Sequence, residues 1–326
     1  MADTPGAGPA GGRQSPILTL TLNPALDMAT DVARIVPGEK LRCGEPLLDP
    51  GGGGLNVSRA IRALGGDSLA LVALGGLTGD RLAGLIRAEG VTFLSILGPG
   101  ETRTSLTVNE AGTGLQYRFM LPGPVWGAEE RARVFTLLRA TARPGGISVI
   151  SGSQPPGVPP DFPAQLAASM PESRVVLDTS GAALTQAVTR PIPGLHVLRM
   201  DGEEAEALAG RKLDSRADTA EFAQSLVRQG VAGMVVVARG ADGNVLADIS
   251  QRLFAAAPKV EVKSTVGAGD SFVAAFVLAL ARGQSRSEAL AMGTAAAAAA
   301  VMTDATQLCR PGDVMWLLPQ AAVSTL

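Results

Sequence analysis

The chain has 326 residues, of which 46% are hydrophobic, so it can bury the core of one large domain or of two modest ones. Its 28 basic and 30 acidic side chains give a formal net charge of −2, which lacks the basic excess typical of nucleic-acid-binding proteins. The two cysteines, Cys43 and Cys309, exclude a disulfide framework, and the single histidine excludes an ordinary zinc site.

The chain opens on "MADTPGAGPAGGRQS", which contains no apolar stretch of the kind found in a secretory signal. We therefore expect a disordered tail over residues 1–15. The longest apolar runs, at 272–281 and 295–302, are far shorter than the ~20 residues that a membrane span requires. We expect a soluble, cytoplasmic protein with no membrane partner and no nucleic-acid partner.

From residue 16 onward, short apolar strands alternate with helices. In chain order we predict strand 17–22, helix 56–64, strand 69–74, helix 80–89, strand 148–151, helix 163–170, strand 175–178, helix 218–229 and strand 234–238. Strands that are apolar on both faces and alternate with helices are typical of a mostly parallel sheet covered by helices. The interval 30–49 lacks a helical period, and the pattern of 102–121 predicts a hairpin with a glycine-rich turn. Both are candidates for a small β layer or lid.

A turn of small residues precedes an apolar helix in "KSTVGAGDSFVAAF", residues 263–276. Such a turn points free backbone N–H groups and the positive end of the helix dipole at one place, which suits a phosphate. Asp270 repels an anion there, so its useful role is to take a proton from a hydroxyl that attacks phosphorus. The alternative is that Asp270 simply caps the helix, and the motif alone leaves both interpretations open.

Other nucleotide-binding or hydrolase motifs are incomplete at this turn or elsewhere in the sequence. Phe272 stands where a dinucleotide-binding Gly-x-Gly-x-x-Gly needs its last glycine, and the chain contains no Gly-Lys pair for a Walker loop. A hydrolase with Ser271 as nucleophile needs a histidine, and the only one, His196, has no carboxylate motif beside it. The hydrolase is a weaker alternative.

A second glycine cluster, "DPGGGGLNVSRA" at 49–60, also precedes a helix. Four glycines allow a ligand to approach the backbone closely, and the amide of Asn56 offers a donor and an acceptor to sugar hydroxyls. Four cations in the two β intervals are candidates to bind a phosphate on the substrate: Lys40, Arg42, Arg103 and Arg118. Each of these features has a plain alternative, a flexible turn in one case and solvated surface charges in the other.

Together, "GGGGLNVSRAIRALGG" and "STVGAGDSFVAAF" resemble the two signatures of the PfkB (ribokinase-like) carbohydrate kinases. The similarity extends from about Ile17 to the end. Further segments match the phosphofructokinase branch: "LTLNPALD", "GEKLRC", "PGGGGLNV", "YRFMLPG", "SGSQPPGV" and "DTSGAAL". The resemblance implies one kinase domain over 16–326, with a three-layer α/β/α ribokinase-like core and a small β-sheet lid through which relatives often dimerise.

The resemblance also implies a role for each matched residue. Asp270 is expected to be the catalytic base, and Gly267, Ala268 and Gly269 to form the anion hole with their N–H groups. Residues expected at the sugar phosphate are Asp27, Lys40, Arg42, Gly52, Gly53, Asn56, Arg103 and Ser153. Residues expected at the nucleotide are Arg199, Arg239, Gly240, Thr265, Gly267 and Gly269. Asp201 and Glu204 offer oxygens to hydrated Mg²⁺.

Substrate choice rests on Gly53. Relatives that act on fructose 1-phosphate or tagatose 6-phosphate commonly carry lysine at this position, whereas an all-glycine run resembles the minor type of phosphofructokinase. We therefore expect ATP and fructose 6-phosphate as substrates, with fructose 1-phosphate and tagatose 6-phosphate as alternatives.

Three segments depart from the family pattern. "RMDGEE" at 199–204 replaces Lys-Pro-Asn-x-x-Glu, and "ARG" at 238–240 replaces Ser-x-Gly, so a hydroxyl is lost and Arg239 is expected to compensate as a cation. "MTDATQLC" at 302–309 lacks the Asn, Gly and Arg that relatives place around a monovalent-cation loop, so such a cation is left open. These departures are the only support for a further alternative, a non-catalytic sugar-phosphate sensor.

Overall fold

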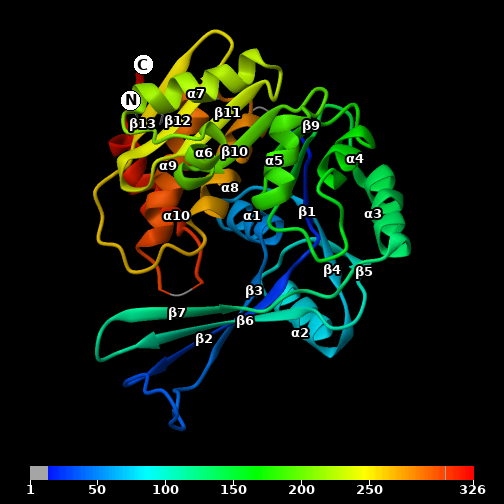
Figure 1. Ribbon diagram of the computed structural model, residues 1–326, viewed down its shortest axis with the longest axis vertical. Helices are drawn as coiled ribbons and strands as arrows, with labels where there is room; N and C mark the ends of the chain where they lie inside the picture. The colour runs from blue at the N-terminus through cyan, green and yellow to red at the C-terminus, as the bar shows by residue number, and fades with distance from the viewer. Residues whose placement is uncertain (1–13, 305) are drawn as a thin grey trace, which may run out of the picture.

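The computed structural model describes residues 14–304 and 306–326 (Figure 1). Most of the predicted tail, residues 1–15, therefore lies outside the described residues. Its last two residues are attached to the core, because the Gln14 side chain donates to the Asp67 carbonyl at 2.6 Å and the Ser15 N–H donates to the Ala281 carbonyl at 2.8 Å. The prediction of a disordered tail is wrong for these two positions.

One large sheet forms the centre of the protein. Its strands, in spatial order, are β14 (Val323–Thr325), β13 (Arg252–Ala256), β12 (Gly243–Asp248), β11 (Met234–Ala238), β10 (Val197–Asp201), β9 (Arg174–Asp178), β8 (Ile147–Ser151), β1 (Ile17–Thr21), β4 (Leu69–Leu74) and β5 (Phe93–Leu97). Neighbours from β11 to β5 are parallel, whereas β12, β13 and β14 are added antiparallel at one edge. Apart from the edge strand β5, the parallel strands are mostly buried on both faces, which explains their continuous apolar sequences.

Helices cover both faces of this sheet (Figure 1). One face carries α1 (Gly53–Ala63), α2 (Gly76–Ala88), α8 (Ala268–Ala281), α9 (Arg286–Val301) and α10 (Pro311–Leu317). The other carries α3 (Ala128–Thr141), α4 (Phe162–Ala168), α5 (Gly181–Thr189), α6 (Gly202–Ala209) and α7 (Arg216–Arg228). Alternate strand residues supply the two cores, as Val149 faces α8 and Ile150 faces the opposite layer. The predicted three-layer α/β/α core is confirmed.

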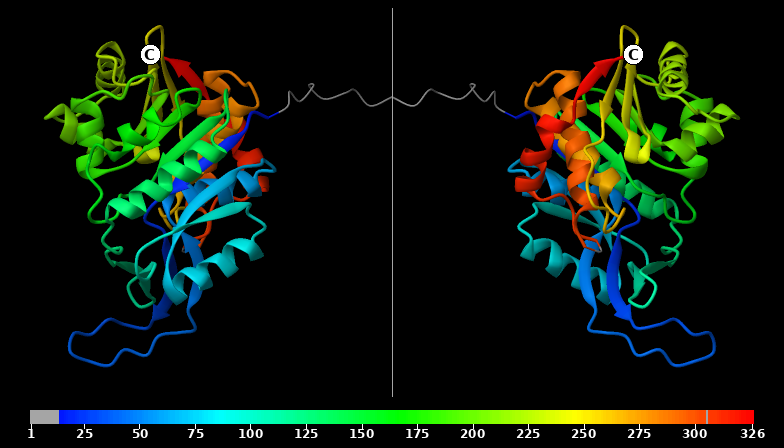
Figure 2. Two further views of the ribbon diagram at one scale, coloured as in Figure 1. Left: turned by 90° about the vertical axis from the view of Figure 1, so that its right-hand side faces the viewer. Right: turned by 90° about the vertical axis from the view of Figure 1, so that its left-hand side faces the viewer.

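A second, four-stranded sheet projects from one end of the core (Figure 2). Its order is β3 (Leu47–Gly51), β2 (Ala25–Val32), β6 (Arg103–Glu110) and β7 (Leu115–Met120), and only the β2–β6 pair is parallel. The predicted hairpin at 102–121 is confirmed. The predicted start of the other β interval, 30–49, is too late in the chain, because β2 starts at Ala25, directly after Asn23 and Pro24.

Helix α1 begins three residues earlier than the sequence pattern predicted, within the glycine cluster itself. The reason is close packing against β1: a methyl group on Gly54 would lie 2.5 Å from the Leu20 carbonyl oxygen and 2.8 Å from Thr21 Oγ1. Only glycine lets the first turn of α1 sit this close to the strand.

No helix among the described residues is both long and apolar enough to cross a membrane.

This packing predicts opposite effects for two glycine substitutions. Gly54→Ala forces α1 away from β1 and should lower the free energy of unfolding by about 2 kcal/mol. Gly84→Ala, in the exposed middle of α2 with open space around the added methyl group, should raise it by about 0.5–1 kcal/mol. Urea unfolding of both variants beside the parent protein measures this, and equal effects at the two positions would contradict the packing argument.

Candidate active site

Most of the candidate residues gather where the parallel strands β1, β8, β9 and β10 end and helices α1 and α8 begin (Figure 1). In open α/β sheets this carboxyl edge is the usual place for a ligand. Asn56 comes from the first half of α1, Asp178 is the last residue of β9, and Arg199 lies in the middle of β10. Elements far apart in the chain therefore meet at one point.

Helix α8 opens on the predicted small-residue turn. Gly267 precedes its first residue with φ +74°, a left-handed conformation that favours glycine, and a methyl group there would also meet Leu308 at 2.7 Å. The first turn of a helix leaves backbone N–H groups without intrahelical partners, so the turn can bind an anion.

Asp270 lies in this first turn but does not cap it. The helix has no side-chain cap hydrogen bond, and Asp270 Oδ2 instead accepts a hydrogen bond from Asn56 Nδ2 at 2.8 Å. The capping alternative for Asp270 is therefore wrong. Burial, reinforced by the nearby Asp178 carboxylate, raises the pKa of Asp270 to about 6, against the opposing effects of Asn56 and Arg199. A carboxylate with such a pKa is suited to accept a proton near neutral pH.

Arg199 lies directly beside the anion turn. Its Nη1 is 3.1 Å from Asp178 Oδ1, and a methyl group on Gly269 would lie 3.0 Å from its Nη2. Its Nε is buried without a hydrogen-bond partner among the described residues. The guanidinium therefore supplies positive charge under the turn, while one of its arms is held by Asp178.

Residues predicted to bind the sugar form a second group near the carboxyl end of β1; they include Asp27, Gly52 and Gly53. Burial raises the pKa of Asp27 to about 6, although Arg103 and a hydrogen bond from Ser105 oppose the shift. Gly52 has φ +120°, and a methyl group on Gly53 would lie 2.5 Å from Ser151 Oγ. Sequence reasoning assigned these glycines to close approach by a ligand, but the structure shows that protein atoms already fill the space at their Cα atoms.

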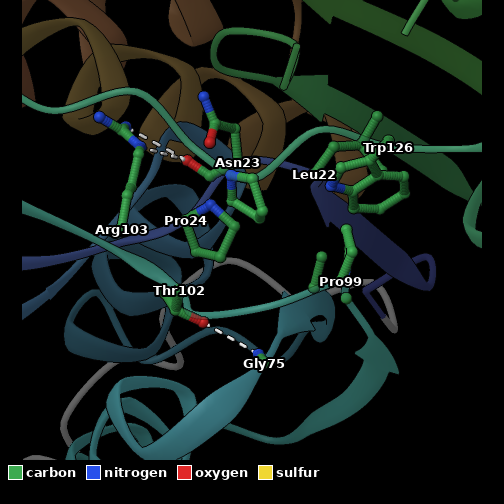
Figure 3. Close-up of a pocket in the computed structure, with 11 residues that line it drawn as sticks. Leu22, Asn23, Pro24, Gly75, Pro99, Thr102, Arg103 and Trp126 are labelled. Atoms are coloured by element: carbon green, nitrogen blue, oxygen red, sulfur yellow. Dashed lines mark hydrogen bonds between the residues drawn. The ribbon is translucent and has the colours of Figure 1, made fainter. Parts of the chain in front are cut away.

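Figure 3 shows a small pocket beside this group, lined by Asn23, Arg103 and Trp126 among others. Arg103 donates from Nε and Nη2 to the Asn23 carbonyl, each at 3.2 Å, and Asn23 Nδ2 donates to Ser153 Oγ at 3.1 Å. Asn23 thus joins two predicted site residues, Arg103 and Ser153. Its position in "LNPALD" was the only signal in the sequence.

Three of the predicted phosphate-binding cations do not lie beside Arg103. Lys40 and Arg42 are exposed in the loop 33–46 between β2 and β3, which extends away from the core as the blue arm in Figure 2. Arg118 is exposed on the edge strand β7, although it is on the same face of the lid as Asp27. The loop carries Lys40 and Arg42 outward, so the four cations are not gathered at one place in this structure, and their role at a substrate phosphate stays a prediction.

Arg239 does not supply the expected free cation. It donates to the Asp242 carboxylate at 3.0 Å, to Thr219 Oγ1, and to the carbonyls of Leu213, Asp214 and Ser215 at 2.9–3.1 Å. These bonds tie the end of β11 to the segment that enters α7, so Arg239 is structural in this state. Gly240 and Thr265 are both exposed. Gly240 follows β11, and Thr265 precedes α8.

Asp201 and Glu204 form a capping box at the start of α6. The Glu204 N–H donates to Asp201 Oδ1 and the Asp201 N–H donates to Glu204 Oε2, each at 2.9 Å. Burial raises the pKa of Glu204. Among the described residues, no group of three or more His, Cys, Asp or Glu side chains is placed to hold a metal ion. Each of the two carboxylates keeps one oxygen free of the box, which fits an ion that is carried mainly by phosphates and water.

The hydrolase alternative is wrong. Ser271 is 0% exposed, and its Oγ accepts the Cys309 N–H at 3.3 Å. His196 precedes β10, at the amino end of the strand, whereas the site lies at the carboxyl end. A buried hydroxyl and a histidine at the opposite edge of the sheet cannot form a triad.

Comparison with known proteins agrees with this geometry. The model of the pfkB family carbohydrate kinases matches residues 20–312. ATP-dependent 6-phosphofructokinase isozyme 2 is 40% identical in Mycobacterium tuberculosis, over 95% of this chain and 91% of the relative, and 39% identical in Escherichia coli K12, over 91% and 96%. The 1-phosphofructokinase of Xanthomonas campestris is 35% identical over 81% of this chain and 83% of the relative.

Two solved structures of phosphofructokinase-2 from Escherichia coli superpose closely. The complex with fructose-6-phosphate has a TM-score of 0.87 at 36% identity, and the complex with potassium has 0.89 at 37% identity. Each comparison covers 94% of this chain and 99% of the other.

The partly buried carboxylate of Asp270 should lower the stability of the protein as the pH rises from 4 through 6. A folded-state pKa of about 6, raised from 3.8, means that the stabilisation of the protonated form is present below pH 4 and is lost as the pH rises through 6. Asp270→Asn removes this penalty, so we expect its free energy of unfolding to exceed that of the parent by up to about 3 kcal/mol at pH 8, and by about half of that at pH 5. Urea unfolding at the two pH values measures the difference.

The control is Asp80→Asn on the exposed surface of α2, which should change stability by less than about 0.5 kcal/mol at either pH. A destabilised Asp270→Asn protein at pH 8 would show that the carboxylate is better accommodated than its burial indicates.

Proposed function

The chain belongs to the pfkB family of carbohydrate kinases, and from this premise we propose that it transfers the γ-phosphoryl group of ATP to the C1 hydroxyl of fructose 6-phosphate. The observation that carries the proposal is the hydrogen bond between Asn56 and Asp270 at the anion-binding turn of α8. The products are fructose 1,6-bisphosphate and ADP. The 6-phosphofructokinase names of the most similar relatives support this choice of sugar.

In the proposed mechanism Asp270 takes the proton from the C1 hydroxyl as its oxygen attacks phosphorus in line. The N–H groups of Gly267, Ala268 and Gly269 stabilise the charge that builds on the transferring group, and Arg199 adds positive charge beneath them. Asp27 and Asn56 orient the sugar hydroxyls, and Arg103 faces its phosphate from β6. The lid excludes water from the transfer.

Gly53 supports fructose 6-phosphate over the alternatives. Because a methyl group there would already lie 2.5 Å from Ser151 Oγ, a lysine at this position would require β8 to shift. The absence of that side chain favours the reading of an all-glycine loop as the fructose 6-phosphate type.

We include Mg²⁺ with ATP as the phosphoryl donor. Asp201 and Glu204 are the residues that would hold the ion, through water and through their oxygens outside the capping box. The ion would neutralise phosphate charge. A monovalent cation is not part of the proposal, because Lys263 already ion-pairs with Asp304 at 3.4 Å in the segment where such a loop is expected.

We also propose that two copies pair through the lid. Several large apolar side chains of the lid are more than half exposed: Leu47, Leu115, Phe119 and Met120. The strand β7 that carries three of them forms an edge of the sheet, with backbone groups open to a partner. An exposed apolar edge of this kind is typical of an interface with another chain.

Turnover with a panel of sugars tests the function. ADP release with ATP and Mg²⁺ should be fastest with fructose 6-phosphate and slower with fructose 1-phosphate and tagatose 6-phosphate. Asp270→Asn should lower kcat by roughly 10²–10⁴-fold, because the reaction loses its general base. Preference for another sugar phosphate would retain Asp270 as the base and overturn the argument from Gly53. Normal turnover by Asp270→Asn would overturn the mechanism.

Sedimentation of two variants tests the pairing. The parent should sediment as a dimer, and Phe119→Lys on β7 should sediment as a monomer, since a charge placed in an apolar interface is costly. The matched control is Leu77→Lys, at the exposed start of α2 away from the lid edge, which should remain dimeric. A dimeric Phe119→Lys protein, or a monomeric parent, would contradict pairing through this edge.

A further inference from the structure

Arg59 has no role in the mechanism above, yet it occupies the centre of a buried network behind the site. It lies on α1 one turn after Asn56, and only 8% of its side chain is exposed. Its Nε and Nη2 donate to the two Glu89 oxygens at 2.6 and 2.7 Å, in a bidentate ion pair. Its Nη1 donates to the Pro50 carbonyl at 2.7 Å and to Asn56 Oδ1 at 3.1 Å. Three separate segments therefore fix the guanidinium.

This arrangement decides which end of the Asn56 amide faces the site. A guanidinium is only a donor, so the Asn56 atom against Nη1 must be the oxygen. The NH₂ end of the amide then points the other way, and it donates to Asp270 Oδ2 at 2.8 Å. An ionised Asp270 favours the same orientation, because a carboxylate only accepts, but when Asp270 is protonated Arg59 is the partner that still fixes the amide.

We propose that Arg59 is a positioning residue for phosphoryl transfer, which holds the Asn56 amide so that it donates to the carboxylate of Asp270. The inference rests on the proposed role of Asp270 as the base. Arg59 itself touches neither the substrate nor the reacting atoms; its charge also favours the ionised form of Asp27, and the proposal concerns its hydrogen bond to Asn56.

The orientation matters because the other groups around Asp270 oppose one another. Asp178 from β9 and Asp27 from β2 disfavour its ionised form, whereas Arg199 from β10 and the Asn56 amide favour it. A reversed amide would place Oδ1 against a carboxylate oxygen and replace an attraction by a repulsion. The pKa of Asp270 would then rise further, and less of the base would be ionised at neutral pH.

The experiment compares Arg59→Met, which keeps much of the apolar stem, with Arg62→Met on the exposed side of the same helix. We expect Arg59→Met to raise the pKa of Asp270 by about one unit, seen by carbon NMR of labelled aspartate with Asp270→Asn for assignment. The acidic limb of the kcat profile should move by the same amount, so that kcat falls roughly fivefold at pH 6 and less than about twofold at pH 8. Arg62→Met should leave both unchanged.

A double variant separates positioning from general support of the fold. In an Asn56→Ala background the amide is absent, so adding Arg59→Met should change kcat by less than about twofold. An unshifted NMR pKa in Arg59→Met, an equal loss of kcat at every pH, or additive losses in the double variant would overturn the proposal.

Two further outcomes remain decisive. If Arg59→Met does not fold, Arg59→Lys takes its place; its single ammonium cannot reach all three partners, and we expect a smaller shift in the same direction, whereas no shift overturns the inference. If the parent protein shows no kinase turnover, the proposed function fails, but the NMR pKa still decides the orientation of Asn56. The two failures are therefore distinguishable.

Discussion

A carboxylate with a second carboxylate close by, both withdrawn from water at the positive end of a helix, constrains everything around it. Asp270 and Asp178 are in this situation, and neither charge is tolerable without nearby donors. The structure supplies Asn56 to one and Arg199 to the other, from α1 and β10. The convergence of four elements at the carboxyl edge of the sheet follows from this requirement as much as from the packing of the cores. These opposing effects give Asp270 a pKa of about 6, so that its carboxylate can accept a proton near neutral pH and release it again.

The glycine run at 51–54 also helps to place Asn56 beside Asp270, because it lets α1 pack closely against the sheet. Asn56 reaches Asp270 only because the first turn of α1 lies against the ends of β1 and β8, and side chains on Gly53 or Gly54 would collide with Ser151 or Leu20. Sequence reasoning placed these glycines around a ligand. In the structure they first allow protein to approach protein, and the position of the amide is the consequence.

The residues that the sequence predicts at the nucleotide depart from the expected family pattern. Ala238 stands where the expected pattern has a serine, and the donors of the neighbouring Arg239 fasten the end of β11 to the segment before α7. Arg199 replaces a lysine, and its broader guanidinium can hold Asp178 while remaining next to Gly269. These substitutions keep positive charge and order near the phosphate site with different contacts, which agrees better with a working kinase than with a decayed nucleotide site.

The sequence by itself determined the alternation of strands and helices in the core, the lid hairpin and the anion turn, because apolar periodicity and small-residue turns act locally. It also singled out Asp270 and Asn56 within their motifs. Only the tertiary structure decided that these two side chains meet, that Arg59 orients one of them, and that Lys40 and Arg42 extend away on a loop. These contacts depend on how elements more than 200 residues apart in the chain pack together. They also depend on which side-chain donors are already hydrogen-bonded to a neighbouring segment, as those of Arg239 are. Local pattern carries no record of either.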